Sequence, residues 1–255
     1  MSELDLNKPA GVLVKTTCVD FPGRVAGSFF LKGCNIRCPY CYNIGLVLSD
    51  SEIPAGTETE PLSTVAELFA HLEKRQGILS GLVISGGEPL LNPYTPLIIR
   101  RAKELGYKIK IDTNGTLPEK LKALIEDDTL HPDFIAMDIK TSPSRYSTLI
   151  CGDKSPFFGK SDYFEKVLKK SAELIAAYPA DCREWRTVLV PGLVTKDDIA
   201  AMAALLPQDA SWQFAQFMNK NCLDPDYNDI YPYTDSEANE LVDFAKSLIN
   251  GSNLR

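Results

Sequence analysis

Three cysteines in the first fifth of the chain are spaced closely enough to bind one metal centre. Cys34, Cys38 and Cys41 form the pattern Cys-x3-Cys-x2-Cys within eight residues. Thiolate ligands favour zinc, copper(I) or iron–sulfur clusters, and both structural zinc sites and cubane clusters usually have four protein ligands. Three thiolates on one loop would therefore leave one coordination position open, where a small molecule could bind and react.

Two other interpretations of the three cysteines remain open from the sequence. Buried cysteines can act as small apolar side chains, and a distant ligand could complete a zinc knuckle. The two histidines, His71 and His131, lie far from the cysteines and show no paired ligand spacing. Close cysteine spacing in an intracellular chain is more typical of metal binding or catalysis, so a metal centre is the favoured interpretation.

The other four cysteines are dispersed, and no two of them have the spacing of metal ligands. The sequence therefore predicts no second cluster, and an odd total of seven does not suit a fully paired disulfide framework. These four residues are Cys18, Cys151, Cys182 and Cys222.

Apolar residues alternate along the chain between short runs typical of strands and the wider spacing typical of helices. Six predicted strands cover residues 25–31, 82–85, 108–112, 134–139, 185–190 and 212–217. A helix is predicted after each strand, near Ser63 or Thr64, Tyr94 or Thr95, Pro118, Phe164, Thr195 and Thr234. A tail at residues 1–10 and an extra strand at 11–19 come before them, and 140–160 is expected to be a polar loop. The alternation predicts parallel strands joined by helical crossovers.

The notable polar motifs fall on the predicted strands or directly after them. From the first strand to the sixth, they are the cysteine loop, Gly86-Gly87-Glu88, Asp112-Thr113-Asn114, Asp138-x-Lys140, Arg186 and Gln216. Sites in parallel α/β folds lie at the carboxyl ends of the strands. This placement predicts one shared site.

The residue types at these positions suit a polar ligand. Glu88 follows two glycines that permit close backbone approach, and it offers an acceptor for an ammonium group. Asp112 and Asp138 would repel each other unless one is protonated or a cation lies between them. Lys140 could supply part of that charge and a bound metal ion the rest. Arg186 would need a partner if buried, either a substrate carboxylate or an internal aspartate. Gly86 and Gly87 could instead form a plain turn, and Asp112, Thr113 and Asp138 could be strand-end turn residues that cap helices.

The composition predicts a soluble, cytoplasmic protein of one domain. The chain has 255 residues, 44% of them apolar, and a net charge of −7. That length fits one large domain or two small ones, and the lack of a short repeat or an obvious linker favours one domain. The apolar content suits a sizeable core, and the negative charge argues against a general nucleic-acid binder. The amino terminus lacks the basic start and apolar core of a signal peptide. No segment approaches the roughly 20 apolar residues of a membrane span.

The cysteine pattern, followed by an aromatic residue, resembles the signature of the radical S-adenosylmethionine (radical SAM) enzymes. The wider chain resembles the long form of the activating proteins of anaerobic ribonucleoside-triphosphate reductase, although activators of different glycyl-radical enzymes share many of its landmarks. Those landmarks are the segments 19–23, 84–89, 112–115, 136–140, 186–192, 216–217 and 223–225. The resemblance implies an α/β fold with a partial (β/α)6 barrel of parallel strands, open on one side, and residues 1–24 as an extension. A doubly wound open sheet is the structural alternative.

The same resemblance implies a [4Fe–4S] cluster on Cys34, Cys38 and Cys41, with SAM bound beside it. By matching positions, it places the methionine amino group of SAM at Gly86, Gly87 and Glu88. It places a monovalent cation, next to the methionine carboxylate, at Asp112, Thr113 and Asp138. Tyr40 would pack near the adenine, Asn43 matches the family, and Tyr42 stands where the family more often has histidine. The further residues expected to bind the cofactor are Asn114, Lys140, Arg186 and Gln216.

The resemblance also implies a reaction and its partners. An external donor such as flavodoxin or ferredoxin would reduce the cluster, and SAM would be cleaved to a 5′-deoxyadenosyl radical that takes hydrogen from a glycine of the reductase. The oxidisable cluster would require low oxygen. Two alternatives are a radical SAM enzyme acting on another glycyl-radical enzyme, a peptide, tRNA or a small molecule, and a non-catalytic zinc or iron–sulfur module that mediates protein contacts.

Overall fold

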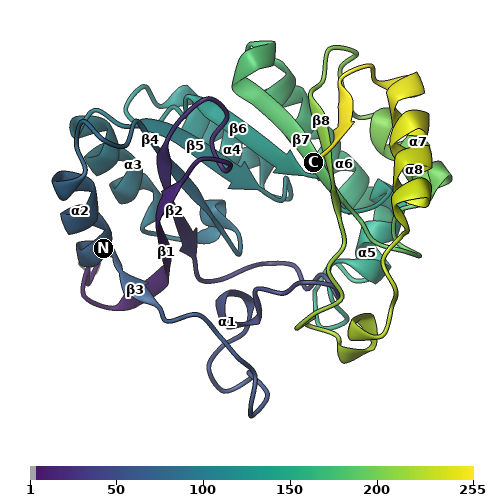
Figure 1. The fold of residues 1–255 in the computed structure, drawn as a ribbon, viewed down its shortest axis with the longest axis horizontal. Helices are drawn as coiled ribbons and strands as arrows, with labels where there is room; N and C mark the ends of the chain where they lie inside the picture. The colour runs from purple at the N-terminus through teal and green to yellow at the C-terminus, as the bar shows by residue number, and fades with distance from the viewer. Residues whose placement is uncertain (1–3) are drawn as a thin grey trace. The chain divides into compact units, whose positions relative to one another are not determined.

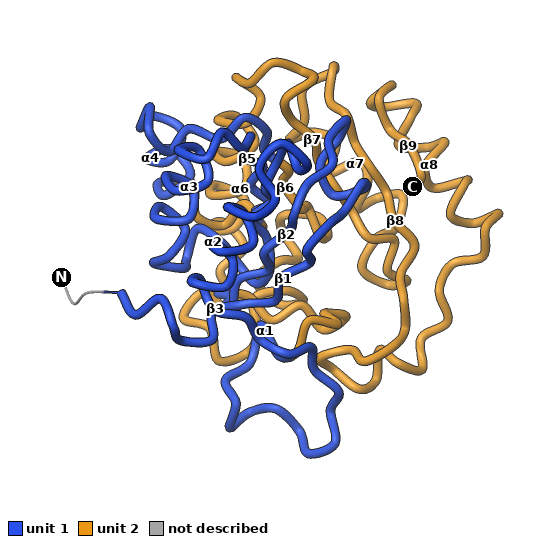
Figure 2. Tube along the Cα trace, turned by 60° about the vertical axis from the view of Figure 1, so that its left-hand side comes forward, with its two compact units in different colours: residues 1–35, 45–113, 119–135 blue, residues 36–44, 114–118, 136–255 orange. Residues whose placement is uncertain are grey.

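The computed structural model describes residues 4–255 and shows a mixed α/β fold with an open, mostly parallel sheet (Figure 1). This confirms the predicted fold class. The chain divides into two compact units, shown in different colours in Figure 2. Unit 1 contains residues 1–35, 45–113 and 119–135, and unit 2 contains residues 36–44, 114–118 and 136–255. The single domain expected from the sequence stays a prediction.

Unit 1 holds the first half of the sheet, in the order β3-β1-β2-β4-β5, and the first residues of β6. β1 pairs antiparallel with β2 and β3, whereas β4 pairs in parallel with both β2 and β5. The helices α2 and α3 lie side by side (Figure 1). The elements wholly or mainly in this unit are β1 (Pro9–Thr17), β2 (Ala26–Leu31), α1 (Ile44–Val47), β3 (Ser63–Thr64), α2 (Val65–Lys74), β4 (Gly81–Gly86), α3 (Thr95–Glu104), β5 (Lys108–Thr113) and α4 (Pro118–Glu126).

Unit 2 holds the second half, in the order β6-β7-β8-β9, with β8 parallel to both β7 and β9. The helix α8 packs beside α7 (Figure 1). Trp185 on β7 and Trp212 on β8 pair across the sheet and are both fully buried in the core of this unit. Its elements are β6 (Phe134–Asp138), α5 (Tyr146–Leu149), α6 (Ser161–Ala176), β7 (Arg183–Leu189), α7 (Lys196–Ala203), β8 (Trp212–Gln216), α8 (Asp235–Leu248) and β9 (Ser252–Leu254).

The six predicted strand–helix repeats are confirmed, with boundaries shifted by a few residues. The predicted tail at 1–10 lies partly outside the described residues, and β1 already begins at Pro9. The expectation of a plain polar loop at 140–160 is wrong, because this stretch contains the helix α5 and a 3-10 turn at Pro143–Arg145. Tyr146 explains the helix, since its fully buried ring anchors the segment against Phe164 of α6. The short strands β3 and β9 lack the length that makes a periodic pattern visible.

The last predicted helix, α8, begins with a capping box at Thr234. Thr234 Oγ1 accepts a hydrogen bond from the Glu237 backbone at 3.3 Å, and the Glu237 carboxylate accepts one from the Thr234 backbone at 2.8 Å. This capping box satisfies backbone N–H groups that have no partner inside α8. Replacing Thr234 with alanine is expected to lower the free energy of unfolding by about 1 kcal/mol. Urea denaturation would measure this loss, and Thr234→Ser should retain most of the stability. Equal losses in both variants would contradict the role of the hydroxyl.

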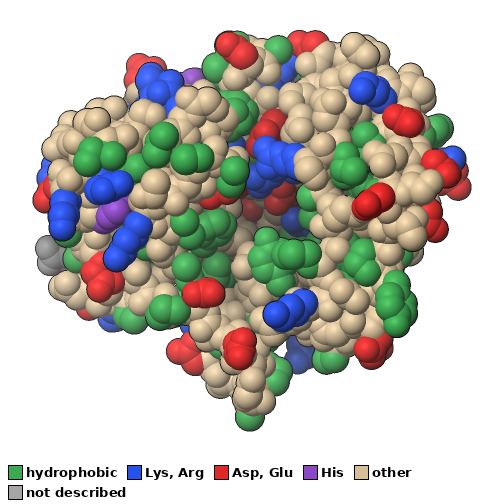
Figure 3. Space-filling model, viewed as in Figure 1, with side chains coloured by type: hydrophobic (Ala, Val, Ile, Leu, Met, Phe, Trp, Pro, Cys, Tyr) green, Lys and Arg blue, Asp and Glu red, His purple; other side chains and the backbone are tan. Residues whose placement is uncertain are grey.

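The surface shown in Figure 3 carries interspersed acidic and basic side chains, in keeping with the modest net charge. Among the described residues, no helix has both the length and the apolar character that crossing a membrane requires.

Candidate functional site

In unit 1, the carboxyl end of β4 lies against the entry to the cysteine loop. Gly86 has φ +119°, and the Gly87 backbone N–H donates to the Leu31 carbonyl at 2.9 Å. A Cβ on Gly87 would lie 2.1 Å from the Gly33 carbonyl oxygen and 3.1 Å from the Cys34 Cβ. The sequence suggested that these glycines allow a ligand to approach. In the structure, the lack of side chains at Gly86 and Gly87 lets the backbone before Cys34, and Cys34 itself, lie close to the end of β4.

Replacing Gly87 with alanine should therefore displace the start of the cysteine loop. The added methyl group would collide with backbone at Gly33, and such overpacking typically costs about 1–3 kcal/mol. We expect a lower unfolding temperature and less iron bound per chain after reconstitution. Gly27→Ala is the matched control, because a Cβ there would meet its nearest atom at 3.7 Å. Equal behaviour of the two variants would contradict the close-approach argument.

Glu88 is fully buried directly after the two glycines. Its backbone N–H donates to the Gly33 carbonyl at 2.8 Å. One carboxylate oxygen, Oε1, accepts hydrogen bonds from the Leu90 N–H at 3.1 Å and from the Thr113 hydroxyl at 3.0 Å. The side chain thus caps the short helix Pro89–Leu91 and also joins two of the predicted motifs, those at the ends of β4 and β5.

Asp112 has a cationic neighbour that the sequence analysis missed. Lys110 Nζ lies 2.7 Å from Asp112 Oδ1, and the two side chains are 0% and 9% exposed. Residues two apart on a strand share one face, so a lysine two residues before a strand-end aspartate was the available signal. A bound cation near Asp112 was predicted partly because Asp112 and Asp138 would repel each other, and Lys110 already gives Asp112 a positive partner. The monovalent cation stays a prediction.

In unit 2, Asp138 at the end of β6 contacts two cations. Arg186 Nε on β7 lies 2.7 Å from Asp138 Oδ1, and Lys140 Nζ lies 3.3 Å from Oδ2. Burial opposes ionisation, but Arg186 and Lys140 hold the pKa of Asp138 well below its usual range. Of the two partners weighed for Arg186, the structure provides the internal aspartate. Asp138 is therefore an anionic strand end with both of its oxygens engaged.

Several buried side-chain polar atoms of unit 2 have no hydrogen-bond partner among the described residues, and two of them belong to predicted site residues. These two atoms are the Tyr40 hydroxyl and Gln216 Oε1. Tyr40 lies on the cysteine loop and is 7% exposed, and Gln216 ends β8. Burying an unpaired polar group is costly, so both atoms suit a site in which a polar ligand completes their bonds. Both residues were predicted to bind the cofactor.

The remaining predicted residues of unit 2 have local roles. Asn114 Oδ1 accepts from the Thr116 backbone at 3.0 Å and from its hydroxyl at 2.6 Å, which shapes the turn after β5. Burial raises the pKa of the Cys41 thiol, and a hydrogen bond to the Asn43 backbone acts in the opposite direction. Tyr42, where the family more often has histidine, is 53% exposed.

A segment near the end of the chain braces the cysteine loop. The Leu223 N–H donates to the Cys41 carbonyl at 2.8 Å, and the Asp224 N–H donates to the Pro39 carbonyl at 2.9 Å. The Tyr40 and Phe217 rings meet edge to face, with centroids 6.4 Å apart. We call residues 217–228 the bracing segment. Part of it carried the sequence resemblance, but its contact with the cysteines was not predicted.

None of the cysteines in the described residues forms a disulfide, so thiols are available as ligands. Cys34 belongs to unit 1, whereas Cys38 and Cys41 belong to unit 2. Among residues 4–255, no three histidine, cysteine, aspartate or glutamate side chains are already gathered as a metal site. The donor chemistry itself fits an iron–sulfur cluster with three cysteine ligands, and the unsatisfied polar atoms at Tyr40 and Gln216 fit a bound polar cofactor.

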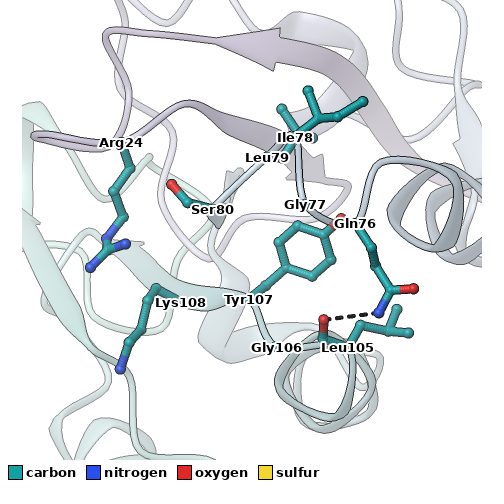
Figure 4. Close-up of a pocket in the computed structure, with 10 residues that line it drawn as sticks. All are labelled: Arg24, Gln76, Gly77, Ile78, Leu79, Ser80, Leu105, Gly106, Tyr107 and Lys108. Carbon is teal, nitrogen blue, oxygen red and sulfur yellow. Dashed lines mark hydrogen bonds between the residues drawn. The ribbon is translucent and has the colours of Figure 1, made fainter.

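A separate pocket of about 380 Å³ lies at the other ends of the unit 1 strands (Figure 4). It is lined by residues 76–80, just before β4, and by Arg24 and residues 105–108, where β5 begins. The predicted residues Gly86 and Thr113 are the last residues of the same two strands. This pocket is therefore not the predicted site.

The open α/β fold and the loop of three cysteines define a class of enzyme. The chain belongs to the radical SAM superfamily, whose family model matches residues 28–206. Membership implies a [4Fe–4S] cluster and SAM as cofactors, and it makes the chain a radical SAM enzyme.

The chain is similar to one protein by sequence and to two solved structures by fold. A Methanocaldococcus jannaschii protein with the provisional name of glycyl-radical enzyme activating enzyme is 29% identical over 251 residues, which cover 95% of this chain and 94% of that protein. The structure of QueE from Escherichia coli matches with a TM-score of 0.51 at 15% identity, covering 98% of this chain and 91% of QueE. The structure of TYW1 with a lysine-pyruvate adduct matches with a TM-score of 0.56 at 13% identity, covering 87% and 73%. The two structural matches show a shared fold.

Proposed function

We propose that this chain is an activating enzyme that generates a glycyl radical on a partner enzyme, with anaerobic ribonucleoside-triphosphate reductase as the favoured partner. The observation that carries this proposal is the 29% identity to the M. jannaschii protein, which extends over 95% of this chain and 94% of that one. A match confined to the cysteine loop would support only the superfamily. The landmark segments 186–192, 216–217 and 223–225 add support from the second half of the chain.

Different residues of the chain bind the cluster and SAM. Cys34, Cys38 and Cys41 hold the cluster, and Glu88 accepts a hydrogen bond from the methionine amino group of SAM. Tyr40 and Gln216 complete their hydrogen bonds with the same cofactor.

The cluster, when bound and reduced by an external donor such as flavodoxin or ferredoxin, supplies the electron that splits SAM into methionine and a 5′-deoxyadenosyl radical. The glycine of the partner gives up one Cα hydrogen atom to that radical. In this proposal the enzyme works in a cytoplasm with little oxygen.

In this proposal, Arg186 and Lys140 act through their positive charges on Asp138. They keep Asp138 ionised, because its pKa is held far below neutrality even though burial opposes ionisation. A fixed anion at the end of β6 can orient cationic or hydroxyl groups of a ligand. Its charge does not change over the physiological pH range, so SAM binding is expected to be independent of the ionisation of Asp138 at neutral pH.

The decisive test uses protein reconstituted with iron and sulfide without oxygen. Reduced protein should cleave SAM to methionine and 5′-deoxyadenosine, and electron paramagnetic resonance should detect a glycyl radical on added reductase. A reductase whose radical glycine is replaced by alanine is the matched control. SAM cleavage without a radical on any glycyl-radical enzyme of the host would refute the activating role. Radical formation on a different glycyl-radical enzyme would replace the reductase as the partner.

A further inference from the structure

A fourth cysteine lies next to the cysteine loop, although the sequence showed it only as one of the dispersed thiols. Cys222 belongs to the bracing segment and is 4% exposed. The peptide N–H that directly follows it, that of Leu223, donates to the carbonyl of Cys41 at 2.8 Å. Burial, followed by the neighbouring Cys41 thiol, raises the pKa of the Cys222 thiol. Cys222 and Cys41 therefore lie in the same small volume of unit 2.

The backbone of Cys222 is fixed on both sides. Its own N–H donates to Asn228 Oδ1 at 2.9 Å, while the following N–H is the one bound to Cys41. Asn221, just before it, has φ +55°, a left-handed conformation that few residues other than glycine adopt. Local strain of this kind persists where surrounding contacts hold it, so Cys222 occupies a defined position.

We propose that Cys41 and Cys222 are a redox pair that closes an intramolecular disulfide when Cys41 carries no metal. The Cys41 carbonyl oxygen accepts the hydrogen bond from the N–H of Leu223. The Cα of Cys41 is two bonds from that oxygen, and the Cα of Cys222 is two bonds from that nitrogen. Such proximity suits the Cα separation of about 4.4–6.8 Å that a disulfide spans.

The chemistry is ordinary thiol–disulfide exchange with a small disulfide such as oxidised glutathione as the oxidant. The thiolate of Cys41, the less buried of the two, attacks one oxidant sulfur, forms a mixed disulfide and releases one glutathione thiolate. The Cys222 thiolate then attacks the Cys41 sulfur and releases the second. Two protein thiols are oxidised, one glutathione disulfide is reduced to two thiols, and the two protons lost by the protein thiols end on the two glutathione thiols.

The consequence for the enzyme rests on the proposed function, in which Cys41 is a cluster ligand. While the disulfide is closed, one of three ligands is withheld and the cluster cannot assemble. The closed form also protects Cys41 from stepwise oxidation to sulfinic and sulfonic acids, which are not reversed by thiols. Reduction of the disulfide would restore the ligand.

Disulfide mapping of metal-free protein tests the pair directly. Iron is removed with a chelator under reducing conditions without oxygen, the reductant is removed, and oxidised glutathione is added before unreacted thiols are alkylated. Trypsin cuts after Arg37 and Lys220, and chymotrypsin cuts after Tyr40, so Cys38, Cys41 and Cys222 fall in separate peptides. Mass spectrometry should find the Cys41–Cys222 peptide as the main linked species in wild type and in Cys182→Ser, and should find none in Cys222→Ser.

The outcomes separate this inference from the proposed function. Alkylated Cys222, with linkage only among Cys34, Cys38 and Cys41, would overturn the redox pair even if the reduced protein assembles a cluster. A Cys41–Cys222 link in a protein that never binds iron would support the pair and refute the cluster. The closed form should take up iron only after treatment with dithiothreitol, and equal uptake before and after reduction would contradict the proposed control of assembly.

Discussion

Replacing Cys38 with alanine is expected to abolish stable cluster binding and SAM cleavage. Loss of one of three thiolates leaves two protein ligands, too few to hold a cubane with one open iron. Substitutions of residues that only support metal ligands already cost about 10–100-fold in affinity or activity, so loss of a ligand should exceed about 100-fold. Iron and sulfide analysis after anaerobic reconstitution, together with the yield of 5′-deoxyadenosine, measures both effects. Alanine is chosen because serine could still coordinate iron through oxygen.

Cys18→Ala is the matched control for this prediction. Cys18 is an exposed thiol outside the cysteine loop, so this variant should bind iron and cleave SAM as the wild type does. Because Cys38 is only 7% exposed, its replacement could disturb folding, so the far-UV circular dichroism spectrum of Cys38→Ala should be recorded to show that the variant folds. Full iron content in folded Cys38→Ala would contradict the cluster assignment. Equal losses in both variants would indicate a general effect of removing thiols.

The order of elements was predictable because each repeat carries its own local signal. A helix was predicted near Thr195, and α7 begins there, where the hydroxyl of Thr195 accepts a hydrogen bond from the Asp198 N–H at 3.3 Å. The strand predicted at 82–85 is β4, which ends one residue later, at Gly86. Signals of this kind depend only on neighbours in sequence, so they can be recognised without knowledge of the tertiary structure.

The contacts that shape the site depend on residues far apart in sequence. Nothing near Cys41 indicates that its carbonyl accepts from Leu223, because bracing contacts leave no periodic pattern. The close approach of Gly87 to Gly33 was not predicted either, since a glycine that admits a ligand and a glycine that admits the backbone of Gly33 look identical in sequence. The residues assigned to cluster and SAM binding stay predictions for the tests above.

Lys110→Met should produce the largest loss of stability among single substitutions on β5. Lys110 and Asp112 form an ion pair at 2.7 Å with side chains 0% and 9% exposed, and Lys110 Nζ lies 5.7 Å from the centre of the Phe134 ring. Removing one partner of a buried pair typically costs about 3–5 kcal/mol, because the other charge stays in a poorly solvated place. Methionine keeps much of the apolar stem, so the loss reports mainly on charge. Urea denaturation would measure it.

The same strand supplies a matched control for that loss. Lys108 and Asp133 form an ion pair of similar length, 2.6 Å, but their side chains are 52% and 27% exposed. Solvent screening limits such pairs to about 0–1 kcal/mol, so Lys108→Met should change stability little. The double variant Lys110→Met/Asp112→Leu removes both buried charges and should be more stable than Lys110→Met alone, since no unpaired charge remains. Equal losses in Lys108→Met and Lys110→Met would show that burial does not set the strength of the Lys110–Asp112 pair. A double variant less stable than Lys110→Met would show that Asp112 stabilises β5 through contacts other than that pair.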